Sequence, residues 1–224
     1  MVAVIKKGKV PGTSKVPGTS VALRLQHSGK KVMARKVKFI QGHYYHIYNR
    51  GVGRQPIFRI QDNYRFLLHR IKEHASRLSI TMVAYCLMPN HYHFLVRQDG
   101  SHAVSLLIQM VFNSYSKAFN KMFNRTGTLF EGRFKAIHVD QETYLLHLCR
   151  YIHSNPVKDG LVRRPEDWPY SNYLEWIGAR NGTLVDRQFV QACFPQPEAY
   201  RRFVLAYLAG RESLPEGMES YLLE

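Results

Sequence analysis

Two short apolar runs separated by a tight turn occupy residues 80–96, and this pattern restricts how the chain can fold. Residues 80–87 (ITMVAYCL) and 91–96 (HYHFLV) are rich in β-branched and aromatic side chains, which favour extended backbone. Only Met88-Pro89-Asn90 separates them, and this tripeptide is typical of a turn. The sequence therefore predicts an antiparallel hairpin over residues 80–96.

The segments around the hairpin alternate between strand and helix patterns. They are a strand at Tyr44–Asn49, a helix at 62–77, a helix at Ala103–Phe123, a strand at Phe130–Val139, and a helix at Gln141–His153 that stops before Asn155-Pro156. The resulting order, β-α-β-β-α-β, predicts an α+β fold: a ferredoxin-like split βαβ antiparallel sheet with helices on one face. Helical patches at 187–193 and 198–209 predict a C-terminal helical extension.

Composition divides the chain into three parts. Residues 9–20 repeat the hexapeptide KVPGTS, whose Pro and Gly oppose helix and strand, so we expect residues 1–32 to be a disordered basic tail. An alternative is that translation starts at Met33 and that the tail is absent from the native protein. Residues 33–178 form the expected main domain, and residues 179–224 form the helical extension.

Positive charge is concentrated in the middle of the chain. The protein has 32 Lys and Arg against 16 Asp and Glu, a net charge of +16. Residues 33–137 hold 16 of the basic residues and four of the acidic ones, whereas residues 138–224 are net negative. Such a segment indicates a polyanionic partner, most simply nucleic acid, although a solvated basic surface without a partner would have the same composition.

Neither a membrane span nor a disulfide framework is expected. No apolar run approaches the roughly 18 residues that a membrane span needs. The three cysteines, Cys86, Cys149 and Cys193, are far apart and form no CxxC motif. The sequence therefore predicts a cytoplasmic protein that does not contact the membrane.

His91 and His93 are the first candidates for chemistry. Residues i and i+2 of a strand point to the same side, so the two imidazoles are expected to project together. Two neutral imidazoles suit a divalent transition metal, or Mg²⁺ or Mn²⁺ with oxygen ligands completing the shell. The alternative is two surface histidines among the 11 in the chain.

Tyr115 is the second candidate, in the middle of the helix expected at Ala103–Phe123. If that helix brought its hydroxyl over the two histidines, the phenol could attack a phosphate and form a covalent phosphotyrosine. The alternative is a core role, because Tyr115 is in register with the apolar residues Val111, Phe112 and Phe119.

Basic and aromatic residues alternate along the middle segment. Cations bind phosphates and aromatic faces stack on unpaired bases, so the mixture favours single-stranded or hairpin DNA over the groove of a duplex. Solvated charge beside core aromatics is the alternative. The cations are Arg50, Arg54, Arg59, Arg97, Lys117, Lys121, Arg125, Arg133 and Lys135.

Taken together, these segments resemble the single-tyrosine HUH transposases, and within them the branch of REP-associated tyrosine transposases. Each segment alone is a modest match, but their order is specific, and together they cover about residues 33–176. The matching segments are MARKVKFIQGHYYHIYNRG (33–51), YCLMPNHYHFLV (85–96), NSYSKAFNKMFNRTGTLFEGRFK (113–135), YIHSNPVKDGLV (151–162) and WPYSNY (168–173).

The resemblance implies the HUH nuclease fold and a DNA strand-transfer reaction. His91 and His93 would bind Mg²⁺ or Mn²⁺, and Tyr115 would cleave single-stranded DNA at palindromic hairpins through a 5′-phosphotyrosine. From charge and motif position, Arg50, Arg133 and Lys135 are the expected DNA contacts.

One position departs from the family pattern. Related enzymes often supply a third metal ligand one turn after the tyrosine, and here that position is Phe119. Asn120 could serve if the helix were distorted, because the i+5 position of a regular helix points about 140° away. His46 on the neighbouring strand is another candidate, and it is equally readable as a structural histidine.

Two other functions compete with the nuclease. One is a non-catalytic hairpin-binding protein domesticated from such a transposase. The other, which the single tyrosine helix and the short chain disfavour, is a replication initiator or plasmid relaxase. Monomer and homodimer are both compatible with the sequence.

Overall fold

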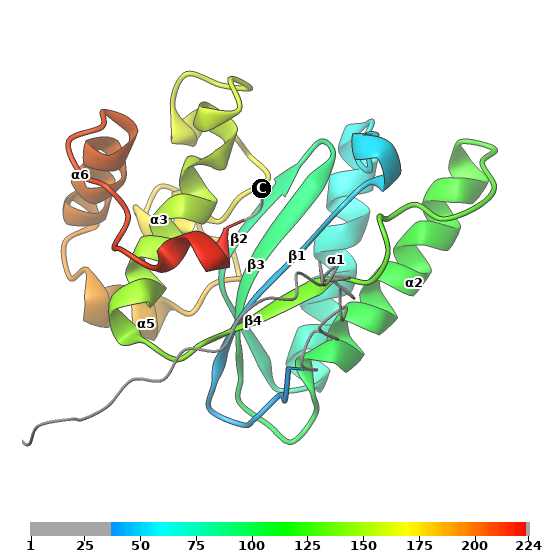
Figure 1. Cartoon of the computed structure of the whole chain (residues 1–224), viewed down its shortest axis with the longest axis horizontal. Helices are drawn as coiled ribbons and strands as arrows, with labels where there is room; N and C mark the ends of the chain where they lie inside the picture. Colours follow the sequence, from blue (N-terminus) through cyan, green and yellow to red (C-terminus); the bar gives the residue numbers. More distant parts are fainter. Residues whose placement is uncertain (1–36, 223–224) are drawn as a thin grey trace, which may run out of the picture. The chain divides into compact units, whose positions relative to one another are not determined.

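The computed structural model describes residues 37–222. Its sheet consists of β1 (Tyr44–Arg50), β2 (Ile80–Met88), β3 (His91–Gln98) and β4 (Lys135–Val139). The helices are α1 (Gln61–Arg77), α2 (Val104–Met122), α3 (Glu142–Lys158), α4 (Tyr173–Trp176), α5 (Arg187–Cys193) and α6 (Pro197–Leu208) (Figure 1). Three short 3-10 turns are η1 (Val52–Arg54), η2 (Pro165–Asp167) and η3 (Met218–Tyr221).

The four strands form one antiparallel sheet in the order β2-β3-β1-β4. In this order β3 lies between β1 and β2, and β1 lies between β3 and β4, which is the split βαβ arrangement. The predicted hairpin and fold class are therefore confirmed. On the central pair, Arg50 lies opposite His91 and Tyr48 lies opposite His93.

The two faces of the sheet carry separate cores. On one face, which we call the α1/α2 face, Ile47, Tyr92 and Phe94 pack against residues of α1 and α2. On the other, the α3 face, Cys86 and Leu95 pack against residues of α3 and α6. Figure 1 shows α1 and α2 on one side of the strands and α3 on the other. Because neighbouring strand residues point to opposite sides, β3 contributes to both cores.

The prediction of helices on one face holds for α1 and α2, but the second face is not open. It is covered by α3 and by residues of the C-terminal extension, including Tyr200 and Val204, which are fully buried. The physical reason is that Leu95 and its neighbours make this face apolar as well, so it also has to be buried. The predicted helical patches of the extension are α5 and α6.

Two predicted boundaries are wrong. The strand expected from Phe130 begins only at Lys135, and Phe130 forms an isolated bridge to Gly51. The helix expected to end at His153 continues through Pro156 to Lys158. A proline removes one backbone donor from a helix, here the donor for the Ile152 carbonyl. The side chain of Asn155 substitutes for it by donating Nδ2 to that carbonyl at 3.5 Å, and to the carbonyl one residue earlier at 2.8 Å.

The expected tail at residues 1–32 and the alternative start at Met33 lie outside the described residues. Within residues 37–222, no helix is long and apolar enough to cross a membrane.

Candidate active site

His91 and His93 project together from β3, as their spacing predicted, and they do so on the α3 face. Their rings are 5.1 Å apart between centroids and nearly perpendicular. His93 is fully buried and His91 is 9% exposed. Burial lowers the pKa of His91 to about 4 and lowers that of His93 well below its ordinary value. Both rings are therefore neutral at pH 7 and carry a lone pair for a ligand.

Neighbouring groups fix which nitrogen of each ring carries that lone pair. Nδ1 of His91 is 2.6 Å from Oδ1 of Asn90, an oxygen that only accepts, so Nδ1 carries the proton. Nδ1 of His93 is 3.0 Å from Nε2 of the buried His46, which occupies that nitrogen. Nε2 of His93 is buried and has no hydrogen-bond partner. An imidazole that binds a metal needs one nitrogen free for the ion, while a hydrogen bond at the other nitrogen fixes the orientation of the ring.

His46 does not act as the third ligand. Its Nε2 contacts His93, and its Nδ1 is 2.7 Å from the carbonyl oxygen of Tyr221. Both ring nitrogens are therefore used inside the protein. The sequence left two interpretations of His46 open, a metal ligand and a structural histidine. The structure supports the second, because His46 contacts His93 from behind.

The helix α3 places a different tyrosine beside the histidines. The ring centroid of Tyr151 lies 5.5 Å from that of His93, in an edge-to-face arrangement. Asn155 follows one turn later and donates its Nδ2 backward to helix carbonyls, which leaves the Oδ1 side of the amide for other partners. Tyr151 and Asn155 therefore approach the histidines from the helix that packs over them.

A cavity of about 400 Å³ lies beside His91, Tyr151 and Asn155. It is lined by Arg50, Arg54, Asn90, His91, Tyr151, Asn155, Lys158, Asp159 and Leu222. Three of these residues are cations, and Lys158 is held in place by Tyr207 of α6, whose hydroxyl is 2.9 Å from its ammonium nitrogen. A cavity with three cations against one carboxylate, that of Asp159, and with the neutral imidazole of His91 and the phenol of Tyr151 in its wall suits a phosphodiester.

Tyr115 does not lie over the histidines, so the geometric part of that prediction is wrong. Its side chain belongs to the core of the α1/α2 face, only 1% exposed, on the opposite side of the sheet. Its hydroxyl donates to the carbonyl of Ile57. Burial raises the pKa of the Tyr115 phenol far above its usual value, which opposes the ionised form of a nucleophile. The core reading of Tyr115 is the one that the structure supports.

Asn120, like Tyr115, belongs to α2 and so does not lie on the side of the sheet that carries the two histidines. It lies near the end of α2, where its Nδ2 donates to the carbonyl of Gly127 at 2.9 Å and fastens the loop after the helix. The structure therefore does not bring Asn120 to His91 and His93, because α2 packs on the α1/α2 face.

The three expected DNA contacts differ in their placement. Arg50 lines the cavity and forms an ion pair with Glu131 at 2.5 Å. Lys135 begins β4, with its ammonium 5.8 Å from the ring centroid of Tyr48 on the neighbouring strand. Arg133 is exposed in the loop that precedes β4. Only Arg50 is part of the cavity itself.

Sequence reasoning missed Tyr151 and Asn155, although the sequence holds a signal for them. A polar residue one turn after the tyrosine is absent at Phe119 but present four residues after Tyr151. That i, i+4 spacing puts Tyr151 and Asn155 on the same face of one helix. Because the expected helix ended before Asn155, the two residues were not recognised as a pair on one helix.

The histidines fit a metal in part. Nε2 of His93 is buried without a partner, and each ring is held through its Nδ1, which leaves Nε2 as the nitrogen suited to a divalent ion. Among residues 37–222, however, no three His, Cys, Asp or Glu side chains gather into a metal-binding group. Further ligands would have to be of another kind, such as the Asn155 amide, water or a phosphate oxygen.

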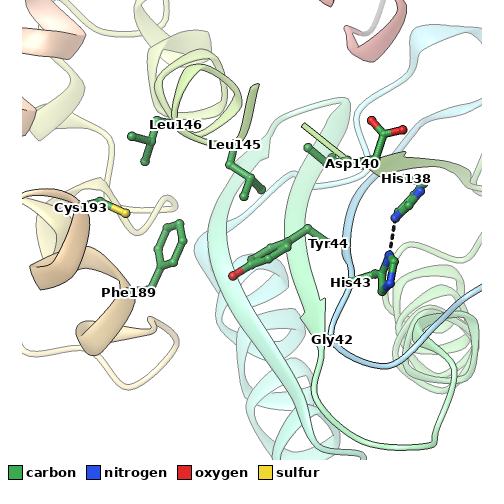
Figure 2. Close-up of a pocket in the computed structure, with 10 residues that line it drawn as sticks. Gly42, His43, Tyr44, His138, Asp140, Leu145, Leu146, Phe189 and Cys193 are labelled. Atoms are coloured by element: carbon green, nitrogen blue, oxygen red, sulfur yellow. Dashed lines mark hydrogen bonds between the residues drawn. The ribbon is translucent and has the colours of Figure 1, made fainter. Parts of the chain in front are cut away.

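A second cavity, of about 520 Å³, lies at the far end of the sheet (Figure 2). Tyr44 lies in its wall, near Leu145 and Phe189, and is six residues from Arg50 along β1, or roughly 20 Å. Its two histidines, His43 and His138, pair with each other at 2.7 Å between ring nitrogens. It contains neither predicted histidine, so the smaller cavity is the candidate active site.

Comparison with known proteins agrees with this assignment of the fold. The sequence pattern of the family described as "Transposase IS200 like" matches residues 39–155, which is 117 of the 224 residues. A Haemophilus influenzae protein provisionally named as a REP-associated tyrosine transposase is 27% identical over 112 residues, 46% of this chain. The chain spans 64% of the length of that curated relative.

A solved structure described as a REP-associated tyrosine transposase bound to a REP hairpin has the same fold. It superposes with a TM-score of 0.55 at 19% identity, and the match covers 68% of this chain and 96% of the other.

Proposed function

The chain belongs to the IS200-like transposase family, and from that premise we propose that it cleaves and rejoins single-stranded DNA with Tyr151 as the nucleophile. One observation carries the choice of residue: Tyr151 packs against His93 and lines the same cavity as His91. Its helix neighbour Asn155 lines that cavity too. Tyr115, the tyrosine that the sequence favoured, has none of these contacts and lies in the other core.

In the proposed reaction the phenol oxygen of Tyr151 attacks the phosphorus of a phosphodiester. A bond forms between that oxygen and phosphorus while the bond from phosphorus to the 3′ oxygen breaks. The phenol loses its proton and the departing 3′ oxygen gains one, which leaves a 5′-phosphotyrosine and a free 3′-hydroxyl. Because the covalent link retains the bond energy, the reverse reaction rejoins DNA without a nucleotide cofactor.

His91 and His93 would hold a divalent ion, Mg²⁺ or Mn²⁺, with Oδ1 of Asn155 as a third ligand, and the ion would polarise the scissile phosphate. The protein's own cations, Arg50 and Lys158 at the cavity rim, would bind the flanking phosphates.

The proposed substrate is a DNA hairpin with an unpaired flank. The solved relative with the same fold is described as bound to a REP hairpin. In this chain the charge supports the same class of substrate, since residues 33–137 have 16 basic and four acidic residues. Action on such DNA would take place in the cytoplasm, as the sequence predicted.

A covalent trap tests the proposal. The full chain is mixed with labelled single-stranded hairpin oligonucleotides from the flanks of its gene, in Mn²⁺ or in EDTA, and run on a denaturing gel. We expect a Mn²⁺-dependent band that survives SDS. It should be lost in Tyr151→Phe and retained in Tyr115→Phe, a matched control that removes one tyrosine hydroxyl from the opposite face of the sheet.

Two results would count against the proposal. An adduct that persists in Tyr151→Phe would show that another residue is the nucleophile. A gel shift with the same oligonucleotide but without any adduct in Mn²⁺ would support a domesticated hairpin-binding protein instead.

A further inference from the structure

The end of the chain is connected to the candidate active site by hydrogen bonds. We infer that the backbone carbonyl of Tyr221 orients His46, and through His46 holds His93 in the tautomer whose Nε2 carries the lone pair. The C-terminal turn η3 would thus be a positioning element for the reaction. This inference rests on the proposed function, in which His93 is a ligand.

The contacts form an unbroken line. Nδ1 of His46 is 2.7 Å from the carbonyl oxygen of Tyr221, and Nε2 of His46 is 3.0 Å from Nδ1 of His93. The rings of His46 and His93 are stacked at 16° with centroids 5.2 Å apart. Both histidines are fully buried, so water does not compete for these nitrogens.

The chemistry of the groups allows only one direction of proton donation. A carbonyl oxygen accepts and cannot donate, so Nδ1 of His46 must carry a proton. A neutral imidazole has one donor and one acceptor, so Nε2 of His46 accepts from Nδ1 of His93. Nε2 of His93 is then left with a lone pair, and it is the buried ring nitrogen without a partner. Without the carbonyl, Nδ1 of His46 would have no acceptor, and these contacts would no longer fix the proton of His93 on Nδ1.

The position of the carbonyl does not depend on His46 alone. Met218 is fully buried in the core of the α3 face, and Tyr221 packs edge-to-face on Tyr144 of α3 at 5.4 Å between centroids. The Tyr144 hydroxyl also donates to the carbonyl of Glu216 at 2.9 Å. Leu222, the next residue, lines the cavity. The turn is therefore anchored independently and can impose an orientation on His46.

The alternative is that His46 only fills space in the core. A space-filling role would affect stability, but it would not select a tautomer of His93. The experiment therefore has to read the tautomer directly. Replacing His46 by leucine removes both polar atoms, whereas glutamine keeps one donor and one acceptor in a single side chain.

The first measurement is nitrogen NMR of the metal-free protein, in which protonated and unprotonated imidazole nitrogens give separate signals. We expect the His93 ring to be protonated at Nδ1 in the native chain and in His46→Gln. In His46→Leu it should change to protonation at Nε2. Tyr221→Phe is the matched control, because it removes a hydroxyl but keeps the backbone carbonyl, and it should leave the tautomer unchanged.

The second measurement is the Mn²⁺ dissociation constant, from titration calorimetry. Loss of a partner behind a metal ligand typically weakens binding 10- to 100-fold, so we expect a rise of roughly that size in His46→Leu. His46→Gln should recover most of the affinity, and Tyr221→Phe should keep it. Removing residues 218–224 should resemble His46→Leu, provided that its thermal unfolding shows a folded protein.

The outcomes separate this inference from the proposed function. If His93 is protonated at Nε2 in the native chain, or stays protonated at Nδ1 in His46→Leu, the inference is overturned whether or not DNA is cleaved. Equal Mn²⁺ affinity in the native chain and in folded His46→Leu would overturn it too. If the native chain has the expected tautomer but forms no DNA adduct, the proposed reaction fails while the orienting contact stands.

Discussion

Tyr115→Phe is predicted to weaken the fold without removing the DNA-cleaving activity. The Tyr115 hydroxyl donates to the carbonyl of Ile57, a residue with no solvent exposure. Phenylalanine keeps the ring and its packing, but it leaves that carbonyl without its partner in a dry environment. An unsatisfied buried acceptor lowers the free energy of unfolding by about 1–3 kcal/mol. The substitution does not destabilise the unfolded chain, so nothing offsets this loss.

For a chain of this size, each kcal/mol lowers the melting temperature by roughly 2–4 °C, so we expect a fall of about 2–12 °C for Tyr115→Phe. Urea unfolding followed by tryptophan fluorescence gives the free energy, and the denaturing gel gives the adduct for the same preparation. Tyr151→Phe should show the reverse pattern, with the adduct lost and most of the stability kept.

One combination of results would contradict the structural role of the Tyr115 hydroxyl. If Tyr115→Phe had the stability of the native chain and formed no adduct, Tyr115 would be a reactive group and its buried hydrogen bond would be irrelevant. The assignment of the two tyrosines to opposite faces of the sheet would then have to be reversed.

Three further predictions concern other buried or charged groups. Asn172→Ala should lower the unfolding free energy by about 2–5 kcal/mol in urea, because its amide serves two buried backbone groups of β2 at 2.7 and 3.0 Å; a loss below 1 kcal/mol would contradict this. Lys158→Ala should weaken hairpin binding and lower the slope of log affinity against log salt concentration by about one, measured by fluorescence anisotropy. Lys117→Ala on α2 should have less effect. Equal losses in the two variants would show that Lys158 is not part of the interface. Burial lowers the pKa of His153 from 6.5 to about 4, so the unfolded chain binds more protons in that window. In EDTA, this group should contribute full stability above pH 6.5 and lose about 2 kcal/mol of it by pH 5; a flat urea midpoint between pH 7 and 5 would refute that.

Local patterns were sufficient for most of the fold. The apolar runs on either side of Met88-Pro89-Asn90 became β2 and β3, and the apolar repeat over 104–122 became α2, because strand and helix periods depend on neighbouring residues only. The pairing of His91 with His93 on one side of a strand follows from the same alternation. The end of α3 could not be predicted in this way, because the Asn155 side chain replaced the donor that Pro156 lacks.

The choice of tyrosine was beyond these local patterns. Tyr115 and Tyr151 both lie on apolar stripes of long helices, so periodicity treats them alike. Strand alternation separates His91 and His93 from Tyr92 and Phe94, but both sets have apolar neighbours, so either could face α2. The sequence by itself thus determined the elements, the basic segment and the histidine pair. Only the packing of α2 and α3 on opposite faces decided which phenol meets the histidines, because that depends on contacts between residues far apart in the chain.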